Sequence, residues 1–261
     1  MISHILRKGC CMSRTLSGLS AAMDVKPVVA FLRARGGPDA HPGAPVKTQP
    51  FVTISREAGA GGSTFARSLV AKLNDIESSR LALEEPSAMS VQLWQSFDRE
   101  LIERIADDAQ VAADLIARLE TGSHTWLDDF MSGASLQDRE PSEAALLRRV
   151  IGTVRALAEA GRVVLVGLGG VAITRAMPGA LHVRIVAPLQ YRITHMAALH
   201  GETIKQATER VRLLDANRAA FFRKYFPETL LTPEFFHLTL NSGLLSETEM
   251  VETVLPLLRA K

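Results

Sequence analysis

The stretch ISREAGAGGST, at positions 54–64, holds the residues whose types and spacing most clearly point to chemistry. Apolar residues run into glycines and then into hydroxyl side chains, an order typical of loops that wrap backbone N–H groups around phosphate. The predicted phosphate-binding residues are Gly59, Ala60, Gly61, Gly62, Ser63 and Thr64. Ser63 or Thr64 could offer a hydroxyl to Mg²⁺, and Gly62 stands where such loops usually carry lysine. The alternative is a tight Gly-rich turn that binds no ligand.

Positive charge for a phosphate must come largely from arginine. Only seven of the thirty cationic residues are lysines, and none lies between Lys72 and Lys205. A cationic group farther along the chain contains Arg192, Asp215 and Arg218. Asp215 and Arg218 are three residues apart and therefore share a helix face. This group is either a local ion pair or a cationic lid that closes over a triphosphate and stabilises the transferred phosphoryl group.

A second glycine motif, GLGGVA at 167–172, matches the G-x-G-x-x-A pattern of dinucleotide-binding loops. Such a site also needs an acidic residue at the end of the next strand, to hold a ribose. Here that strand ends in Ala187 and Pro188, which argues against a nicotinamide or flavin cofactor. His195 and His200 are five residues apart and do not share a helix face, so no structural metal is expected.

Composition narrows the class of partner. A chain of 261 residues that is 47% hydrophobic can bury one full core. A net charge of +2 is too close to balance to favour nucleic acid or a membrane surface, so a small phosphorylated ligand is the better expectation. The two cysteines are adjacent, at Cys10 and Cys11, and no apolar run spans about 18 residues. The simplest expectation is a cytoplasmic protein in a reducing compartment.

Strand and helix patterns alternate after a linker rich in Gly and Pro at 35–50. We therefore expect an N-terminal extension over 1–50 and a folded domain over 51–261. Strands are predicted at 51–55, 162–167, 181–187 and 236–242. Helices are predicted directly after the glycine loop, at 98–109, at 142–160, from Pro188, at 203–224 and from Ser246 onward. In the helix at 142–160, Ser142 is the predicted N-cap and Gly161 the C-terminal stop. Pro256 should bend or end the last helix. This alternation predicts an α/β fold with a parallel sheet and helices on both faces.

Several of these segments occur together, in the same order, in a known family. VTISREAGAGGSTFARSLVAKL, FDRELIERIA, VVLVGLGGVAI, LHVRIVAPLQYRI, LLDANRAAFFRKYF and FHLTLNSGLLS make the chain resemble the cytidylate kinase-like family from about residue 51 onward. The resemblance implies a three-layer P-loop NTPase-type domain with a five-stranded parallel sheet and a helical lid. It also implies transfer of the γ-phosphate of ATP to CMP or dCMP with Mg²⁺.

The resemblance assigns roles residue by residue. The glycine loop would hold ATP, and Ser63 would face Mg²⁺. Asp215 and Arg218 match the family's Asp-x-x-Arg lid element, with Arg192 as a further lid cation. Asp98 falls where the family places an acid near the acceptor nucleotide, and Asp98 and Asp215 are the candidate substrate-binding residues.

Two positions depart from the family pattern. The lysine of cytidylate kinases aligns with Gly62, and Arg56 at the start of the loop is the candidate replacement. The family often has arginine after the third strand, where this chain has Leu168, and that strand ends without an acid. The expected function is phosphorylation of a nucleoside monophosphate that relies on Arg56, Arg192 and Arg218. The alternative is a regulatory or scaffolding module that binds nucleotide without turnover. The sequence leaves the oligomeric state open.

Overall fold

The computed structural model describes residues 49–81, 93–98, 102, 141–226 and 232–261. By their contacts the residues group into two compact units, one formed by Pro45–Arg99 with Leu157–Lys261 and the other by Met1–Ala44 with Glu100–Ala156. The predicted boundary near residue 50 stays a prediction. The predicted linker up to residue 48 and the two cysteines lie outside the described residues.

Five parallel strands form one sheet in the larger unit, in the order β2-β3-β1-β4-β5. The strands are β1 (Phe51–Arg56), β2 (Gln95–Asp98), β3 (Val163–Val166), β4 (Ala180–Val186) and β5 (Leu238–Asn241). The glycine loop follows β1, the central strand. The parallel α/β sheet predicted from the alternating pattern is confirmed, and so is the count of five strands that the family resemblance implies.

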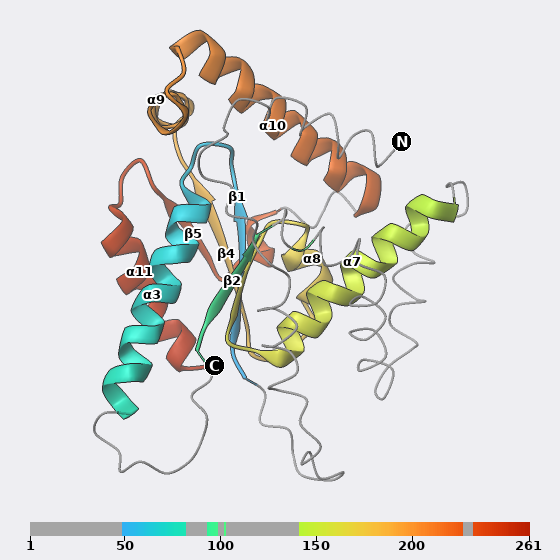
Figure 1. Cartoon of the computed structure of the whole chain (residues 1–261), viewed down its shortest axis with the longest axis vertical. Helices are drawn as coiled ribbons and strands as arrows, with labels where there is room; N and C mark the ends of the chain where they lie inside the picture. The colour runs from blue at the N-terminus through green and yellow to red at the C-terminus, as the bar shows by residue number, and fades with distance from the viewer. Residues whose placement is uncertain (1–48, 82–92, 99–101, 103–140, 227–231) are drawn as a thin grey trace. The chain divides into compact units, whose positions relative to one another are not determined.

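Helices complete the fold. They are α3 (Gly62–Leu81), α7 (Pro141–Ala160), α8 (Gly170–Thr174), α9 (Leu189–His200), α10 (Ile204–Tyr225) and α11 (Glu247–Arg259), with a 3-10 turn η3 (Pro233–Phe235). Helices α9 and α10 form a hairpin at the predicted place of the lid (Figure 1). None of the helices in the described part of the chain is long and apolar enough to cross a membrane.

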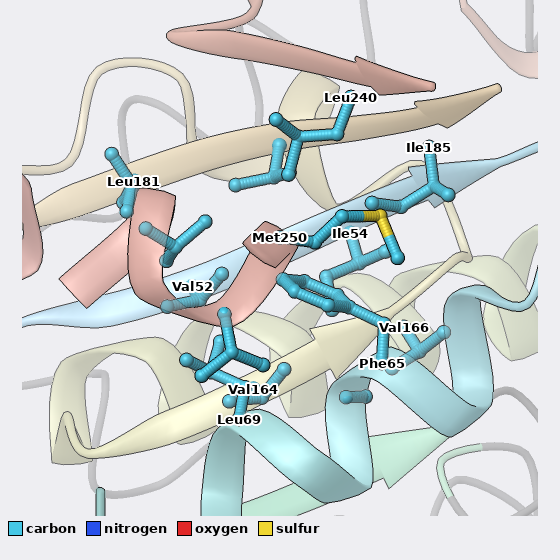
Figure 2. Close-up of a cluster of buried hydrophobic side chains, with 14 of the residues drawn as sticks. Val52, Ile54, Phe65, Leu69, Val164, Val166, Leu181, Ile185, Leu240 and Met250 are labelled. Atoms are coloured by element: carbon cyan, nitrogen blue, oxygen red, sulfur yellow. The ribbon is translucent and has the colours of Figure 1, made fainter. Parts of the chain in front are cut away.

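The main core of the larger unit lies between the sheet and the helices α3 and α11. Phe65 and Leu69 of α3 meet Met250 of α11 over the buried side chains of β1, β3 and β4 (Figure 2). Alternate residues of a strand face opposite sides of a sheet, and Thr53 therefore points away from this core. Its Cβ lies 3.3 Å from the position of a Cβ on Gly170, which places α8 on the other face. The predicted three-layer arrangement is confirmed.

Local signals fixed most helix ends as expected. The capping boxes at Thr203 and Ser246 are both formed, and Gly161 follows α7 with a positive φ of 67°. Ser142 lies just inside α7, because that helix already begins at Pro141. The expectation for Pro256 as a helix end is wrong, since α11 continues through it to Arg259.

The strand β2 was not predicted. The sequence pattern places Asp98 at the start of a helix, whereas Asp98 is the last residue of β2 and pairs in register with Val166. Only Phe97 among the four residues of β2 is buried, so neither an apolar run nor an alternation marks the strand. The rest of the helical pattern predicted for 98–109 lies outside the described residues, apart from a buried helical Ile102.

Candidate phosphate-binding site

The candidate site lies at the carboxyl edge of the sheet, where ligands usually bind in open parallel sheets. Arg56 ends β1, Asp98 ends β2 and Gly167 follows β3. Ala187 and Ser242 directly follow β4 and β5 at the same edge. The parallel register therefore brings the glycine loop, Arg56 and Asp98 to one edge, as their predicted roles require.

The glycine loop turns its carbonyl groups toward protein donors. The carbonyl oxygen of Ala58 accepts from Arg192 Nη1 at 3.1 Å, and that of Gly59 lies 2.7 Å from His195 Nδ1. The Ala60 carbonyl accepts from the Ser242 hydroxyl at 2.9 Å, and the Gly61 carbonyl from the Phe65 N–H at 2.9 Å. A carbonyl oxygen only accepts, so Nδ1 of His195 carries a proton.

The N–H groups of the same loop are left for a ligand. Within the described residues, no partner is found for the N–H groups of Gly59, Gly61, Gly62, Ser63 and Thr64. Gly59 and Gly61 hold positive φ values of 78° and 75°, which glycine adopts without strain. Because α3 begins at Gly62, the partial positive charge of a 20-residue helix adds to these donors. Such an array of N–H donors can bind an anion, and the role of the loop in phosphate binding stays a prediction.

Arg192 and Asp215 hold this loop in place. One oxygen of Asp215 accepts from the Ala58 N–H at 2.8 Å, and the other lies 2.5 Å from Arg192 Nη1. Arg192 Nε donates to the Ala187 carbonyl at 3.1 Å and lies 3.4 Å from a carboxylate oxygen of Glu57. Arg192 is only 8% exposed, and a charge this buried needs such pairing.

Apolar contacts reinforce this attachment. Ala58 is buried in a small cluster with residues of both hairpin helices, namely Ile193, Met196, Ala197, Ala207 and Val211. Farther out, Arg210 pairs with Glu202 through two N–H groups and thereby lowers the pKa of that carboxyl. The α9–α10 hairpin and the glycine loop therefore form one packed element.

The predicted lid pair is formed, with an added contact. Arg218 Nη1 lies 3.6 Å from Asp215 Oδ1, which is the local ion pair expected from their spacing. The same Nη1 lies 3.4 Å from the carbonyl oxygen of Arg56. Arg218 is therefore at the start of the glycine loop, close to where a cation could act on bound phosphate.

Arg56 lies beside Gly62, one of the two positions at which the sequence departs from the family pattern, and reaches Gly167, the neighbour of the other position, Leu168. A Cβ atom on Gly62 would lie 2.8 Å from Arg56 Cβ, so the side chain passes directly over the start of α3. A Cβ atom on Gly167 would lie 2.1 Å from Arg56 Nη1, so the guanidinium group lies at the end of β3. Arg56 thus occupies the space that a lysine at position 62 would enter.

The turn after β3 is closed by protein groups. Leu168 adopts a positive φ of 53° and is 7% exposed, so its side chain is directed into the protein. A Cβ atom on Gly169 would lie 2.6 Å from Phe226 Cε2. Arg56 and the Phe226 ring therefore cover the glycines that a dinucleotide loop would present to a pyrophosphate. This geometry supports the preference for the first glycine loop.

Three residues of the site were missed: Glu57, His195 and Ser242. The five-residue spacing of His195 and His200 predicts no metal site and indicates no other role for His195. The partners of these residues lie 130, 136 and 182 positions away in the chain, so no local spacing reveals them.

Comparison with known proteins supports the same assignment. The model of the cytidylate kinase-like family matches residues 89–244, which is more than half of the chain. The match begins after the glycine loop and includes Asp98, Arg192, Asp215 and Arg218. The chain therefore belongs to the cytidylate kinase-like family, and membership supports a nucleotide-binding, kinase-like function in general terms.

Solved structures resemble the chain in fold. An uncharacterized protein from Eubacterium ventriosum ATCC 27560 is 15% identical with a TM-score of 0.59, covering 82% of this chain and 99% of its own. Shikimate kinase from Bacteroides thetaiotaomicron is 13% identical with a TM-score of 0.39, covering 80% of this chain and 98% of its own. No curated protein sequence matches the chain.

Proposed function

We propose that this member of the cytidylate kinase-like family transfers the γ-phosphoryl group of ATP to a nucleoside monophosphate, with CMP or dCMP as the preferred acceptor. The observation that carries the proposal is the glycine loop, whose carbonyls are held by protein donors. Five N–H groups between Gly59 and Thr64 have no partner among the described residues. Such an array binds the oxygens of a polyphosphate.

The residues present also suit a hard divalent cation, which prefers oxygen ligands. Ser63 is exposed at the second position of α3, and its hydroxyl is the proposed ligand for Mg²⁺. Held there by the Ser63 hydroxyl, Mg²⁺ would neutralise part of the negative charge on the phosphates of the nucleotide.

The proposed reaction needs positioning and charge more than proton transfer. An oxygen of the acceptor phosphate forms a bond to the γ-phosphorus of ATP, and the bond from that phosphorus to the β,γ-bridging oxygen breaks, which yields a nucleoside diphosphate and ADP. The second pKa of a phosphate monoester is about 6, so the attacking oxygen carries no proton at neutral pH. No general base is therefore required. Arg56 and Arg218 supply charge, and Arg192 acts by holding the loop.

Asp98 supports cytidine as the acceptor nucleoside. Asp98 is the last residue of β2, at the carboxyl edge of the sheet, and is exposed to solvent. A carboxylate is a good acceptor for the amino group of cytosine. We infer that Asp98 contacts the acceptor base, whereas Asp215 acts on the glycine loop.

A second candidate function, nucleotide binding without turnover, is favoured by one observation. Leu168 is buried at the position where the family often has arginine, and β3 is followed by Gly167 where other P-loop enzymes carry an acid. Under this alternative the loop binds ATP for regulation or scaffolding.

Measurements of nucleotide binding and of ADP formation distinguish a kinase from a module that binds nucleotide without turnover. Thermal unfolding is followed with MgATP, with CMP and with NAD, since a ligand at a hundred times its Kd adds about 2.7 kcal/mol to the free energy of unfolding. ADP formation is then measured with CMP, dCMP, AMP, UMP and GMP. Stabilisation by MgATP with CMP-dependent ADP formation is expected. Stabilisation by MgATP without turnover would favour the regulatory module, and stabilisation by NAD alone would overturn the P-loop assignment.

A further inference from the structure

The Arg56 side chain lies where the side chain of a lysine at position 62 would begin, so the two cannot be accommodated together. A Cβ atom on Gly62 would lie 2.8 Å from Arg56 Cβ, 3.0 Å from its Cγ and 3.1 Å from its Cδ. Carbon atoms in favourable contact are about 3.5–4.0 Å apart. Because the crowded atoms belong to the base of the Arg56 side chain, a rotation of its end does not relieve the overlap. The absence of a side chain at Gly62 therefore leaves the space that the Arg56 side chain occupies.

The far end of the same side chain reaches the neighbouring strand. Arg56 starts on β1, and its Nη1 and Cζ lie 2.1 Å and 3.2 Å from the position of a Cβ on Gly167, after β3. In the sheet β3 lies between β1 and β2, and Val166 at the end of β3 pairs with Asp98 of β2. The guanidinium thus extends from the glycine loop toward the side of the site that holds Asp98.

We propose that Arg56 supplies both cations that the sequence lacks, the lysine of the glycine loop and the acceptor-side arginine at position 168, and that Gly62 and Gly167 are retained to seat it. The identity of the two ligands, donor polyphosphate and acceptor monophosphate, rests on the proposed function. A guanidinium has five N–H donors in a planar fork and can bind oxygens of two phosphoryl groups at once. Arg56 is then a catalytic residue that contacts both substrates.

The test removes the Arg56 side chain and places a lysine at position 62 of the glycine loop. Three variants are compared with the wild type: Arg56→Gly, Gly62→Lys and the double variant that carries both changes. Arg56→Gly is expected to weaken MgATP binding and to raise the KM for CMP, each about ten- to a hundredfold. Gly62→Lys alone is expected to be at least as damaging, because the lysine and Arg56 collide. The double variant regains MgATP affinity by at least about tenfold over Arg56→Gly, yet its KM for CMP stays raised.

The pattern of results decides each half of the proposal. Wild-type MgATP affinity in Gly62→Lys, or no gain in the double variant, would overturn the exchange of lysine for Arg56. Recovery of the KM for CMP in the double variant would overturn the acceptor role. If the wild type itself binds no MgATP, the proposed function fails instead. The steric coupling is then judged from melting temperatures, where Gly62→Lys must lower Tm and the added Arg56→Gly must restore it.

A matched pair of glycine variants tests the position of the guanidinium. Gly167 and Gly201 both hold positive φ values, 89° and 63°, so alanine strains the backbone at either site. A Cβ at Gly167 displaces the guanidinium, whereas a Cβ at Gly201 meets nothing within 4 Å. Gly167→Ala is expected to raise the KM for CMP about tenfold or more, and Gly201→Ala to lower only Tm. Equal KM values for the two variants would overturn the acceptor role of Arg56.

Discussion

Replacing Asp215 tests whether the hairpin holds the glycine loop or contacts a substrate. Asp215→Ala removes the acceptor of the Ala58 N–H and one of the two carboxylates beside Arg192. A hydrogen bond to a charged group contributes about 1.5–3 kcal/mol, and removing one partner of a fully buried ion pair costs about 3–5 kcal/mol. The Asp215 side chain is 34% exposed, so solvent screening reduces the second cost. We expect a loss of about 2–3 kcal/mol in the free energy of unfolding.

The companion variants of this experiment isolate the mechanism. Asp215→Asn keeps an acceptor for the Ala58 N–H and is expected to lose about half as much stability. Arg192→Met with Asp215→Ala removes the charge that would be left behind, so the double variant should be more stable than the sum of the single changes predicts. Arg212→Gln, at an exposed position of the same helix, is the control and should change the free energy of unfolding by less than about 0.5 kcal/mol.

Urea unfolding and the Kd for MgATP are measured for each of these variants. The Kd should rise in step with the lost stability, because the N–H groups of the loop keep their arrangement only while Ala58 is held. A stability within about 0.5 kcal/mol of the wild type, combined with a raised KM for CMP, would refute the reasoning. Asp215 would then contact the acceptor, as its resemblance to the family's lid residue implies.

Three other predictions concern stability and the loop. Burial and the nearby His237 and Lys261 lower the pKa of His182 to about 4 from 6.5, so the unfolded chain binds a proton between these pH values that the folded chain does not. The free energy of unfolding should therefore fall by up to about 3 kcal/mol as pH drops from 6.5 to 4, and urea titrations of His182→Gln should show a smaller fall. Gly59→Ala should cost more than about 2 kcal/mol and weaken MgATP binding, because its φ is 78° and a Cβ would lie 2.4 Å from the Arg192 carbonyl oxygen; calorimetric binding with unchanged affinity would contradict this. Ser246→Ala should lower the free energy of unfolding by about 1 kcal/mol through loss of the capping box, whereas an unchanged Tm would show that the cap contributes nothing.

Local patterns predicted the parts of the fold that local forces determine. β1, β3 and β4 are nearly continuous apolar segments because central parallel strands are buried on both faces. Each capping box is a motif of four consecutive residues, so it can be recognised in the sequence and predicts where a helix begins. β2 was missed because it lies at the sheet edge with a single buried residue, Phe97. Pro256 did not end its helix, since the apolar face of α11 has the buried residues Val254 and Leu255 before the proline and Leu258 after it.

The candidate site also has a part that local sequence patterns predict and a part that depends on tertiary packing. The glycine loop is contiguous, so its role could be predicted from a few residues. The groups that fix its conformation come from Ser242, directly after β5, and from the hairpin, and tertiary packing alone brings them to the loop. Arg56 was a candidate by position, but only the crowding at Gly62 and Gly167 reveals which departures from the family pattern it accounts for.

The contacts of the hairpin bear on how a lid could move in this protein. The family resemblance implies a mobile lid, yet α9 and α10 are attached to the glycine loop at the Ala58 N–H, the Ala58 carbonyl and the Gly59 carbonyl. A rigid-body rotation of the hairpin would break all three hydrogen bonds and expose the buried charge of Arg192, which is costly. Movement of the hairpin must therefore either carry the loop with it or be confined to the distal turn around Gly201. In the first case lid position and phosphate affinity change together, because the same side chains determine both.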